Sequence, residues 1–456
     1  MGVLAVLEDP HRSLCWVAPA AEGSELATED PLALDYLSQQ VGLWLFPTLT
    51  SRSDRAQAFA MVLFGLSLAE RAIVAYGAPG TDDQRRSFFE RWERFWALAT
   101  MESRNGELPR GHRDSMRGIR GARAAWRPGN GPLLLDFPLI SRQQELGNLG
   151  AYLSPLRRAK LLLDGTLRPS AAALEIIDAF WDEPDNRHRS RYDEYALLAL
   201  DPERRKIERS HANLTLAKVG ENSRLTSLTE RKRTPQQRRL HEALFSSARD
   251  ASTLAMSQLV EAAVRGKVTS TEEIIDGALA GRFVALAPEL RASLETAKAF
   301  GAIVHLLLRT FDLVYDAVSS AGWTVSSASV AQRVFDSSTL GELQAISLQL
   351  LAAPEADRLR ALPMHGAACL RLAGELRSAA AEDALAALLR YHDAVQQERR
   401  RGEGWIRLEH GKLVLLATTY TTQVEAWRFP TYKFPTVRSL LVDTGWLSAR
   451  SAQAAP

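Results

Sequence analysis

The sequence predicts a mainly α-helical, multi-helical protein that carries a small β-hairpin near its C-terminal end. Along most of the chain, apolar residues recur every three or four positions, which is the spacing of one face of an α-helix. Over residues 404–416 the sequence GWIRLEHGKLVLL alternates around His410–Gly411 instead, and this favours two strands joined by a tight turn. The 456 residues allow two to four domains, and a hydrophobic fraction of 46% is that of a folded globular protein.

Three helices are expected in the N-terminal part of the chain. Apolar periodicity places them at residues 31–46, 55–76 and 82–101. The hydroxyl side chains of the intervening segment 50–53 offer N-cap oxygens for the second helix. The third helix carries an aromatic stripe, which we expect to pack against neighbouring helices rather than face water.

The cations of the chain are dominated by arginine. The net charge is only +2, yet arginine contributes 48 of the 56 basic residues. Arginine binds phosphate and carboxylate through paired hydrogen bonds, although a GC-rich genome also favours this residue. Residues 103–132 hold seven Arg against two acidic residues, and a helix over residues 113–127 is expected to align five of them. These five are Arg113, Arg117, Arg120, Arg123 and Arg127. Because like charges repel, the ridge is either solvated, met by acidic side chains elsewhere in the fold, or a binding surface for nucleic-acid phosphate.

A second basic tract lies in a polar stretch of the chain. Residues 187–239 hold 14 basic against 7 acidic residues, and the segment 213–228 lacks helical periodicity and is expected to form loops. The sequence ERKRTPQQRRL then leads into a helix with Pro235 at its first position, and nearly continuous helix follows to residue 400. The candidate phosphate-binding residues of this tract are Arg231, Lys232, Arg233, Arg238 and Arg239.

Residues 137–181 carry the most informative local pattern. Ser154 can cap a short helix that starts at Pro155 and ends at Lys160. Asp164–Gly165 then predicts a tight hairpin turn, because a type I′ turn needs positive φ at both positions. An amphipathic helix over residues 171–181 closes the pattern.

This order of helix, basic helix, hairpin and helix resembles the winged helix-turn-helix modules of bacterial regulators. The resemblance implies a DNA-binding site in which Arg157 and Arg158 lie on the groove-facing helix and Arg168 lies on the wing, near a phosphate. An embedded winged helix is also often a protein-docking module, so both interpretations stay open.

No motif of a catalytic site occurs in the sequence. There is no GxxxxGK[ST] phosphate loop, no GxSxG elbow and no HExxH pair. The two cysteines, Cys15 and Cys369, are too few for a disulfide framework or a cysteine-rich metal site. We therefore expect no catalytic residue, no metal and no cofactor. The one enzymatic alternative is a metal-dependent nuclease that draws on acidic residues near His188, among them Asp193 and Glu194.

Three passages at spaced positions suggest a family context. They are GLWLFPTLTSRSDRAQAFAMVLFGL at residues 42–66, FPLISRQQELGNLGAYLSPLRRAKLL at residues 137–162, and the alternating segment 404–416. Together they resemble uncharacterised bacterial proteins found near helicases and nucleases in antiphage defence islands. The resemblance implies a genomic context and carries over no catalytic residue.

These patterns divide the chain into five expected segments. They are an N-terminal helical domain (1–132), a winged helix-turn-helix-like domain (133–182), a basic polar connector (183–235), a helical domain (236–402), and a C-terminal β-hairpin and tail (403–456).

The expected function follows from the basic tracts. The leading hypothesis is a non-enzymatic DNA-binding subunit of a bacterial multi-protein system, with a helicase or nuclease as protein partner. The alternative is a scaffold that docks such a protein without touching DNA. The apolar start of the chain is too short for a signal peptide, and its longest apolar run carries charged residues, so we expect a cytoplasmic protein without a membrane partner.

Overall fold

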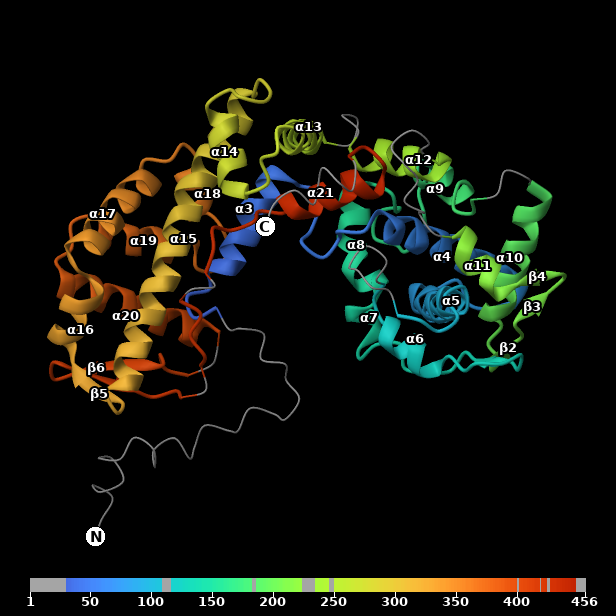
Figure 1. Cartoon of the computed structure of the whole chain (residues 1–456), viewed down its shortest axis with the longest axis horizontal. Coiled ribbons are helices and arrows are strands. Elements are labelled where there is room, and N and C mark those ends of the chain that lie inside the picture. The colour runs from blue at the N-terminus through green and yellow to red at the C-terminus, as the bar shows by residue number, and fades with distance from the viewer. Residues whose placement is uncertain are drawn as a thin grey trace, which may run out of the picture. The chain divides into compact units, whose positions relative to one another are not determined.

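The structure is a computed structural model of the chain, and it describes eight ranges of residues (Figure 1). These ranges are 30–108, 116–182, 186–223, 234–245, 250–399, 402–418, 420–424 and 427–447. The chain divides into two compact units, each built from two separate stretches of sequence. Unit 1 contains Met1–Leu45 and Ser270–Tyr432, and unit 2 contains Phe46–Thr269 and Lys433–Pro456. Each unit is described by itself.

Unit 1 is a helical assembly with one small sheet. Its elements are α3 (Leu34–Leu45), α14 (Thr271–Leu279), α15 (Pro288–Ser320), β5 (Thr324–Ser326), α16 (Ser327–Val334), α17 (Ser337–Leu351), α18 (Ala356–Arg360), α19 (Gly366–Leu376), α20 (Ala381–Glu398), β6 (Ile406–Glu409) and β7 (Lys412–Leu415). The 33-residue helix α15 packs against α3, α14, α16 and α17, so its apolar side chains form the centre of this unit.

The sheet of unit 1 has the strand order β5-β7-β6, and both pairs are antiparallel. β6 and β7 meet at His410 and Gly411, which have φ angles of 47° and 75°. These positive φ values are those of the tight turn that the sequence pattern indicates. The third strand, β5, pairs with β7 through three residues only. A strand this short leaves no alternating pattern in the sequence.

Two buried polar side chains fix the loops of unit 1. Asp312 on α15 accepts hydrogen bonds from Tyr420 Oη (2.5 Å), the Gln423 amide (2.6 Å) and Trp427 Nε1 (2.7 Å). His392 on α20 accepts from the Trp405 amide through Nε2 (3.0 Å), and its Nδ1 lies 2.8 Å from the Pro31 carbonyl. Burial lowers the pKa of His392 to about 4, so its ring is neutral, and Nδ1 carries the proton that the Pro31 carbonyl accepts.

Unit 2 is also mainly helical. Its elements are α4 (Ala56–Ala75), α5 (Asp82–Glu102), α6 (Ile119–Ala125), β1 (Leu133–Leu134), α7 (Gln143–Leu146), α8 (Asn148–Arg158), η3 (Ala171–Ala173), α9 (Leu174–Asp178), α10 (Asn186–Leu200), β2 (Lys206–Ile207), β3 (Ser210–His211), β4 (Leu214–Thr215), α11 (Leu216–Asn222), α12 (Pro235–Leu244), α13 (Ala251–Arg265) and α21 (Phe434–Asp443). β1 pairs with β2, and β3 pairs with β4, each time antiparallel.

The core of unit 2 surrounds α4 and α5. The rings of Phe64 and Phe180 stack with their centroids 4.3 Å apart, and Trp181 packs edge-on against Phe64 at 5.1 Å. The indole of Trp92 lies 5.8 Å from Phe180 and donates a hydrogen bond to the Met61 carbonyl (3.1 Å). The aromatic stripe of α5 is buried here, which confirms its expected packing role.

Helix α4 is the one described helix that is long and apolar enough to cross a membrane, and 67% of its apolar window is buried inside the protein. Length and composition of this kind are shared by the core helices of folded domains, so α4 is weak support for a membrane span.

The three expected N-terminal helices are confirmed as α3, α4 and α5 within a few residues. The expected cap of α4 is wrong, because none of the hydroxyls of residues 50–53 caps it. The N-cap is Arg55, which makes no side-chain cap, and the Ala56 amide donates to the Asp443 carboxylate instead (3.1 Å). The start of α12 is confirmed: Pro235 lies in its first turn, and Thr234 forms a capping box with Gln237.

The expected loop over residues 213–228 is wrong over Leu216–Asn222, which is α11. Thr215 caps this helix, and Gly220 lets it approach α5 so closely that a Cβ at this position would lie 2.1 Å from the Ala99 carbonyl oxygen. The helix was missed because it has only seven residues and buries two apolar side chains, Leu216 and Val219, beside the glycine, which is too few to give a helical period. Helices α10 and α11 both pack on α5, so the described part of segment 183–235 belongs to the core of unit 2. The five expected segments therefore do not coincide with the two units.

Candidate nucleic-acid interface

The arginine-rich segment of unit 2 forms a helix much shorter than the sequence pattern predicts. Helix α6 begins after Gly118, which has a φ of 78°, and it ends at the extended residue Trp126. Gly121, inside α6, packs directly against the later segment Pro138–Leu139, because a Cβ there would come within 2.2 Å of the Leu139 carbonyl oxygen. The prediction of one helix over residues 113–127 is therefore wrong in the described range 116–127, because the turn at Gly118 delays the start of α6 to Ile119 and Trp126 is already extended. Residues 113–115 lie outside the described residues.

Trp126 anchors the C-terminal end of α6. Its side chain is buried, and its Nε1 donates to Glu102 Oε2 over 2.6 Å. Glu102 also pairs with Arg209, whose Nε donates to the Gly131 carbonyl over 2.8 Å. The guanidinium carbons of Arg123 and Arg209 lie 5.6 and 5.8 Å from the Trp126 ring centroid, which is the geometry of a cation–π contact. This network fixes α6 and the loop that follows it to the end of α5.

Arg120, Arg123 and Arg127 are exposed on and just after α6. Arg120 and Arg123 are three residues apart on the helix and share one face. The Arg127 guanidinium donates to the carbonyls of Ala124 and Trp126, the latter over 3.1 Å. Within the described ranges, none of these three arginines forms an ion pair with a carboxylate, so their charge is not neutralised by the fold. We call them the α6 cations.

Arg127, one of the α6 cations, lines a groove of about 490 Å³ between α6 and the β1–β2 pair. Its lining residues are Gly121, Ala124, Ala125, Arg127, Pro132, Leu133, Leu134, Phe137, Pro138 and Lys206. No carboxylate is among these lining residues, and Leu134 is 51% exposed. α6 and β2 lie along the same edge of unit 2, the lower one in Figure 1. We call this feature the α6 groove.

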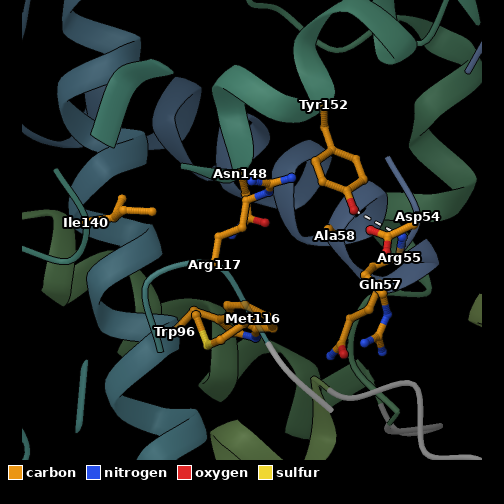
Figure 2. A pocket seen from close by; sticks show the side chains of 10 residues that line it. All are labelled: Asp54, Arg55, Gln57, Ala58, Trp96, Met116, Arg117, Ile140, Asn148 and Tyr152. Atoms are coloured by element: carbon orange, nitrogen blue, oxygen red, sulfur yellow. Dashed lines mark hydrogen bonds between the residues drawn. The ribbon is translucent and has the colours of Figure 1, made fainter. Parts of the chain in front are cut away.

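Arg117 does not join the α6 cations, because it lies before the turn at Gly118. It lines a second cavity of about 370 Å³, together with Asp54, Arg55, Gln57, Ala58, Trp96, Met116, Ile140, Asn148 and Tyr152. In Figure 2, the Tyr152 hydroxyl and the Arg55 amide, joined by a 3.1 Å hydrogen bond, lie on the opposite side of the cavity from Trp96 and Met116. The Arg117 guanidinium donates to the Arg52 carbonyl over 3.1 Å.

Two charged side chains at this second cavity and beside it, Arg55 and Glu93, have partners within the fold. Arg55 pairs with Asp443 at 3.1 Å, and both side chains are largely buried. The fully buried Glu93 carboxylate accepts from the Asn148 amide (2.7 Å), the Asn148 side chain (2.8 Å) and Gln143 (2.7 Å). Burial raises the pKa of the Glu93 carboxyl above its usual range. Glu93 thus caps the N-terminus of α8, and this polar cluster has a structural role.

The segment 133–182 is part of the core of unit 2. Helix α8 begins at Asn148 and contains Pro155 in its interior, so the expected helix that starts at Pro155 is wrong. The reason is that Pro155 lies eight positions along an α8 whose N-terminus is capped from α5 by Glu93. A turn is present at Asp164–Gly165, closed by a hydrogen bond from the Thr166 amide to the Leu163 carbonyl (3.1 Å) and followed by one antiparallel bridge between Leu162 and Pro169. The expected type I′ conformation is wrong, because only Gly165 has a positive φ (72°).

The last helix of this segment is also shorter than expected. It consists of the 3₁₀ turn η3 followed by α9, and the apolar Leu174 is 52% exposed while Ile176 is buried. A 3₁₀ turn has three residues per turn instead of 3.6, so it rotates the buried face of α9 relative to that of one continuous α-helix. The sequence pattern assumed a continuous helix and therefore placed the buried face wrongly. Helices α8 and α9 each pack against α4.

The other predicted cations fall into three groups. Arg157 and Arg158 are exposed at the C-terminal end of α8, and Arg158 donates to the Pro47 carbonyl over 3.2 Å. Arg168 lies 3.5 Å from Glu70, so its charge is matched by a carboxylate.

On α12, Arg238 is exposed, and Arg239 bridges Glu175 at 3.0 Å and Glu242 at 3.2 Å. Helices α9 and α12 lie at the opposite edge of unit 2 from α6, with α4 and α5 between them (Figure 1). The predicted cations therefore do not share one surface. Arg113, Arg231, Lys232 and Arg233 lie outside the described residues.

No metal-binding cluster of three or more His, Cys, Asp or Glu side chains occurs in the part of the chain that the structure describes. Of the acidic residues considered for a nuclease, Asp193 accepts a hydrogen bond from Trp181 Nε1 (2.8 Å) and pairs with Arg71 (2.5 Å). Its carboxylate is thus engaged in a structural contact.

Sequence reasoning missed the residues that complete the α6 groove. Lys206 and Phe137 come from segments about 70 residues apart, and they meet only because β1 pairs with β2 through two residues each. Such a short strand pair leaves no alternating pattern in the sequence. The one available signal was the run of apolar residues and prolines at 132–138, next to the arginines.

Comparison of the chain with protein-family models, curated proteins and solved structures gave no match.

Proposed function

We propose that the protein is a non-enzymatic DNA-binding subunit of a bacterial multi-protein system, of the antiphage-defence kind that its sequence resembles. The α6 cations make the primary contact with the phosphate backbone. Arg157 and Arg158 on α8 are a second group of exposed cations in the same unit.

One observation carries the proposal: the α6 cations are exposed and lack a carboxylate partner among the described residues. Exposed guanidinium groups that the fold does not neutralise attract phosphate and release the counterions condensed on DNA. Arg127 is held by two backbone carbonyls and Arg123 by the Trp126 ring, so their positions are partly fixed before binding. Fixed side chains lose less conformational freedom when they bind a ligand.

The winged helix-turn-helix interpretation of residues 133–182 is a finer proposal. Its support is the order of α7, α8, the Asp164–Gly165 turn and α9, with Arg157 and Arg158 exposed at the end of α8. Under this interpretation α8 enters the major groove and Arg168 approaches a phosphate. The ion pair of Arg168 with Glu70 weighs against a phosphate contact by this side chain.

A protein-docking scaffold is the second candidate function. The observation that favours it is the apolar lining of the α6 groove, in which the half-exposed Leu134 offers surface to a partner. A scaffold of this kind binds its partner equally well at the salt concentrations that abolish contacts with DNA.

The deciding experiment is fluorescence anisotropy of the full chain with short duplex and single-stranded DNA across a salt series. We expect the Arg120→Glu/Arg123→Glu double variant to lose most of the affinity and to lower the slope of log K against log salt by about 2. The matched control is Arg371→Glu/Arg377→Glu, which reverses two exposed arginines of unit 1 and changes the net charge equally. Equal losses in both double variants, or no binding by the wild type at low salt, would contradict the proposal.

A further inference from the structure

We infer that the α6 groove receives an unstacked nucleobase, so that the preferred ligand is single-stranded nucleic acid. The inference rests on the proposed function and names the class of ligand that the same surface takes.

The first support is the chemistry of the groove. Its volume of about 490 Å³ lies in the range of small-ligand sites, and its walls are aliphatic side chains, two prolines and the ring of Phe137. The α6 wall consists of Gly121, Ala124 and Ala125, whose small side chains leave a flat surface. A planar base buries its faces well against flat apolar walls and an aromatic ring.

The second support is the charge at the rim. Arg127, just after α6, and Lys206, on β2, line the groove, and both are exposed. Arg205 precedes Lys206 and is exposed as well, and Arg120 and Arg123 extend the positive surface along α6. The phosphates on either side of an inserted base would meet these cations. The nearest carboxylate in sequence, Asp136, does not line the groove, and it interacts electrostatically with Arg91.

The third support separates single strands from the other candidate ligands. In a duplex the faces of each base are covered by its stacked neighbours, so only an unpaired base can fill an apolar groove. An acidic peptide would pair with the edge of β1, but β1 has two residues and offers few main-chain hydrogen bonds. A single strand uses both the apolar walls and the cations.

The test compares two 12-nucleotide single strands with the same number of phosphates. One carries thymine throughout, and the other has abasic sites at its central positions. We expect the abasic strand to bind the full chain at least about fivefold more weakly, with the same salt slope, because stacking and not charge is lost. Equal affinities for the two strands would overturn the inference and leave the proposed function intact. No binding of either strand would instead contradict the proposed function.

An Ala124→Phe variant supplies the second readout, because it fills the groove and leaves every charge in place. We expect it to bind both strands with the weak affinity of the abasic strand. The control is Ala345→Phe at an exposed helical position of unit 1, which should retain the preference for the intact strand. A variant with the wild-type preference would overturn the inference and return the groove to the protein-docking hypothesis.

A Leu134→Ser variant keeps the test valid if Ala124→Phe fails to fold. Leu134 is 51% exposed, so its replacement should cost little stability. Leu348→Ser is its control, since Leu348 in unit 1 is 52% exposed. We expect only Leu134→Ser to reduce the preference for the intact strand, by about two- to fivefold. An unchanged preference in a folded Leu134→Ser protein would count against the inference.

Discussion

Two edges of unit 2 carry exposed arginines, and they differ in what those arginines contact. At the edge formed by α9 and α12, Arg239 bridges Glu175 and Glu242. At the edge formed by α6, Arg120, Arg123 and Arg127 meet a tryptophan ring, backbone carbonyls or solvent. The electrostatic attraction for a polyanion depends on charges that the fold leaves unmatched. An arginine-rich sequence alone therefore does not locate a phosphate-binding surface.

The largest expected effect concerns the stability of the two edges. Glu102 pairs with Arg209 and accepts from Trp126, and these side chains are largely buried, so Glu102→Ala leaves a largely buried cation without its carboxylate partner. We expect Glu102→Ala to lower the free energy of unfolding by about 2–4 kcal/mol. Glu175→Ala removes one of the two exposed carboxylate partners of Arg239 and should cost less than about 1 kcal/mol.

Chemical denaturation of the two variants measures this difference. If both variants lost a similar amount of unfolding free energy, Glu102 would not anchor α6. The α6 cations would then not be held in position by this network.

The second effect concerns the salt dependence of DNA binding. Arg120→Ala/Arg123→Ala should lower the salt slope by about 1.8, because each phosphate contact contributes about 0.9. Arg168→Ala/Arg239→Ala removes the same number of charges, but both arginines are already paired with carboxylates, so the slope should change by less than about 0.5. Anisotropy titrations between 50 and 200 mM salt give both slopes. The reverse order of the two effects would move the interface to the α9–α12 edge.

The smallest effect is expected for α8. Arg158 already donates to a backbone carbonyl, and Arg157 stands beside it at the C-terminal end of the helix, where cations stabilise the helix dipole. Arg157→Ala/Arg158→Ala should therefore lower the affinity for DNA by less than about threefold. A loss as large as that of the α6 double variant would support the winged helix-turn-helix interpretation and make α8 the main reader of DNA.

In unit 1, the pH dependence of the free energy of unfolding tests the effect of burying His392. Burial lowers the pKa of His392 from its usual value near 6.5 to about 4, so the folded state disfavours the charged ring. The stabilisation by neutral His392 is present above pH 6.5 and is lost as the pH falls from 6.5 towards 4. His392→Gln should remove this part of the pH dependence of unfolding, and an unchanged profile would show that another group titrates there.

The sequence predicted the parts of the fold that depend on local periodicity. Helices α3, α4, α5 and α20 follow from apolar spacing, and the start of α12 follows from Thr234 and Pro235. The errors arose where tertiary contacts decide. Gly118 delays the start of α6 because it forms a turn with a positive φ, and Gly121 inside the helix lets α6 approach the Leu139 carbonyl closely.

The candidate site was predicted only in part. Three of its arginines were singled out from the sequence, but the pairing of Arg168 and Arg239 with carboxylates depends on residues far away in the chain or on another helix. The α6 groove needs Lys206 beside Phe137, and a strand pair of two residues leaves no sequence signal for that contact. Local patterns therefore located cations, and the tertiary fold determined which of them stay free of carboxylates.

The most direct measurement is photo-crosslinking of the full chain to a single strand that carries 5-iodouracil, followed by mass spectrometry of the digested protein. The account predicts nucleotide adducts within residues 116–142, which hold α6 and one wall of its groove. Adducts confined to residues 157–168, to α12 or to unit 1 would contradict it.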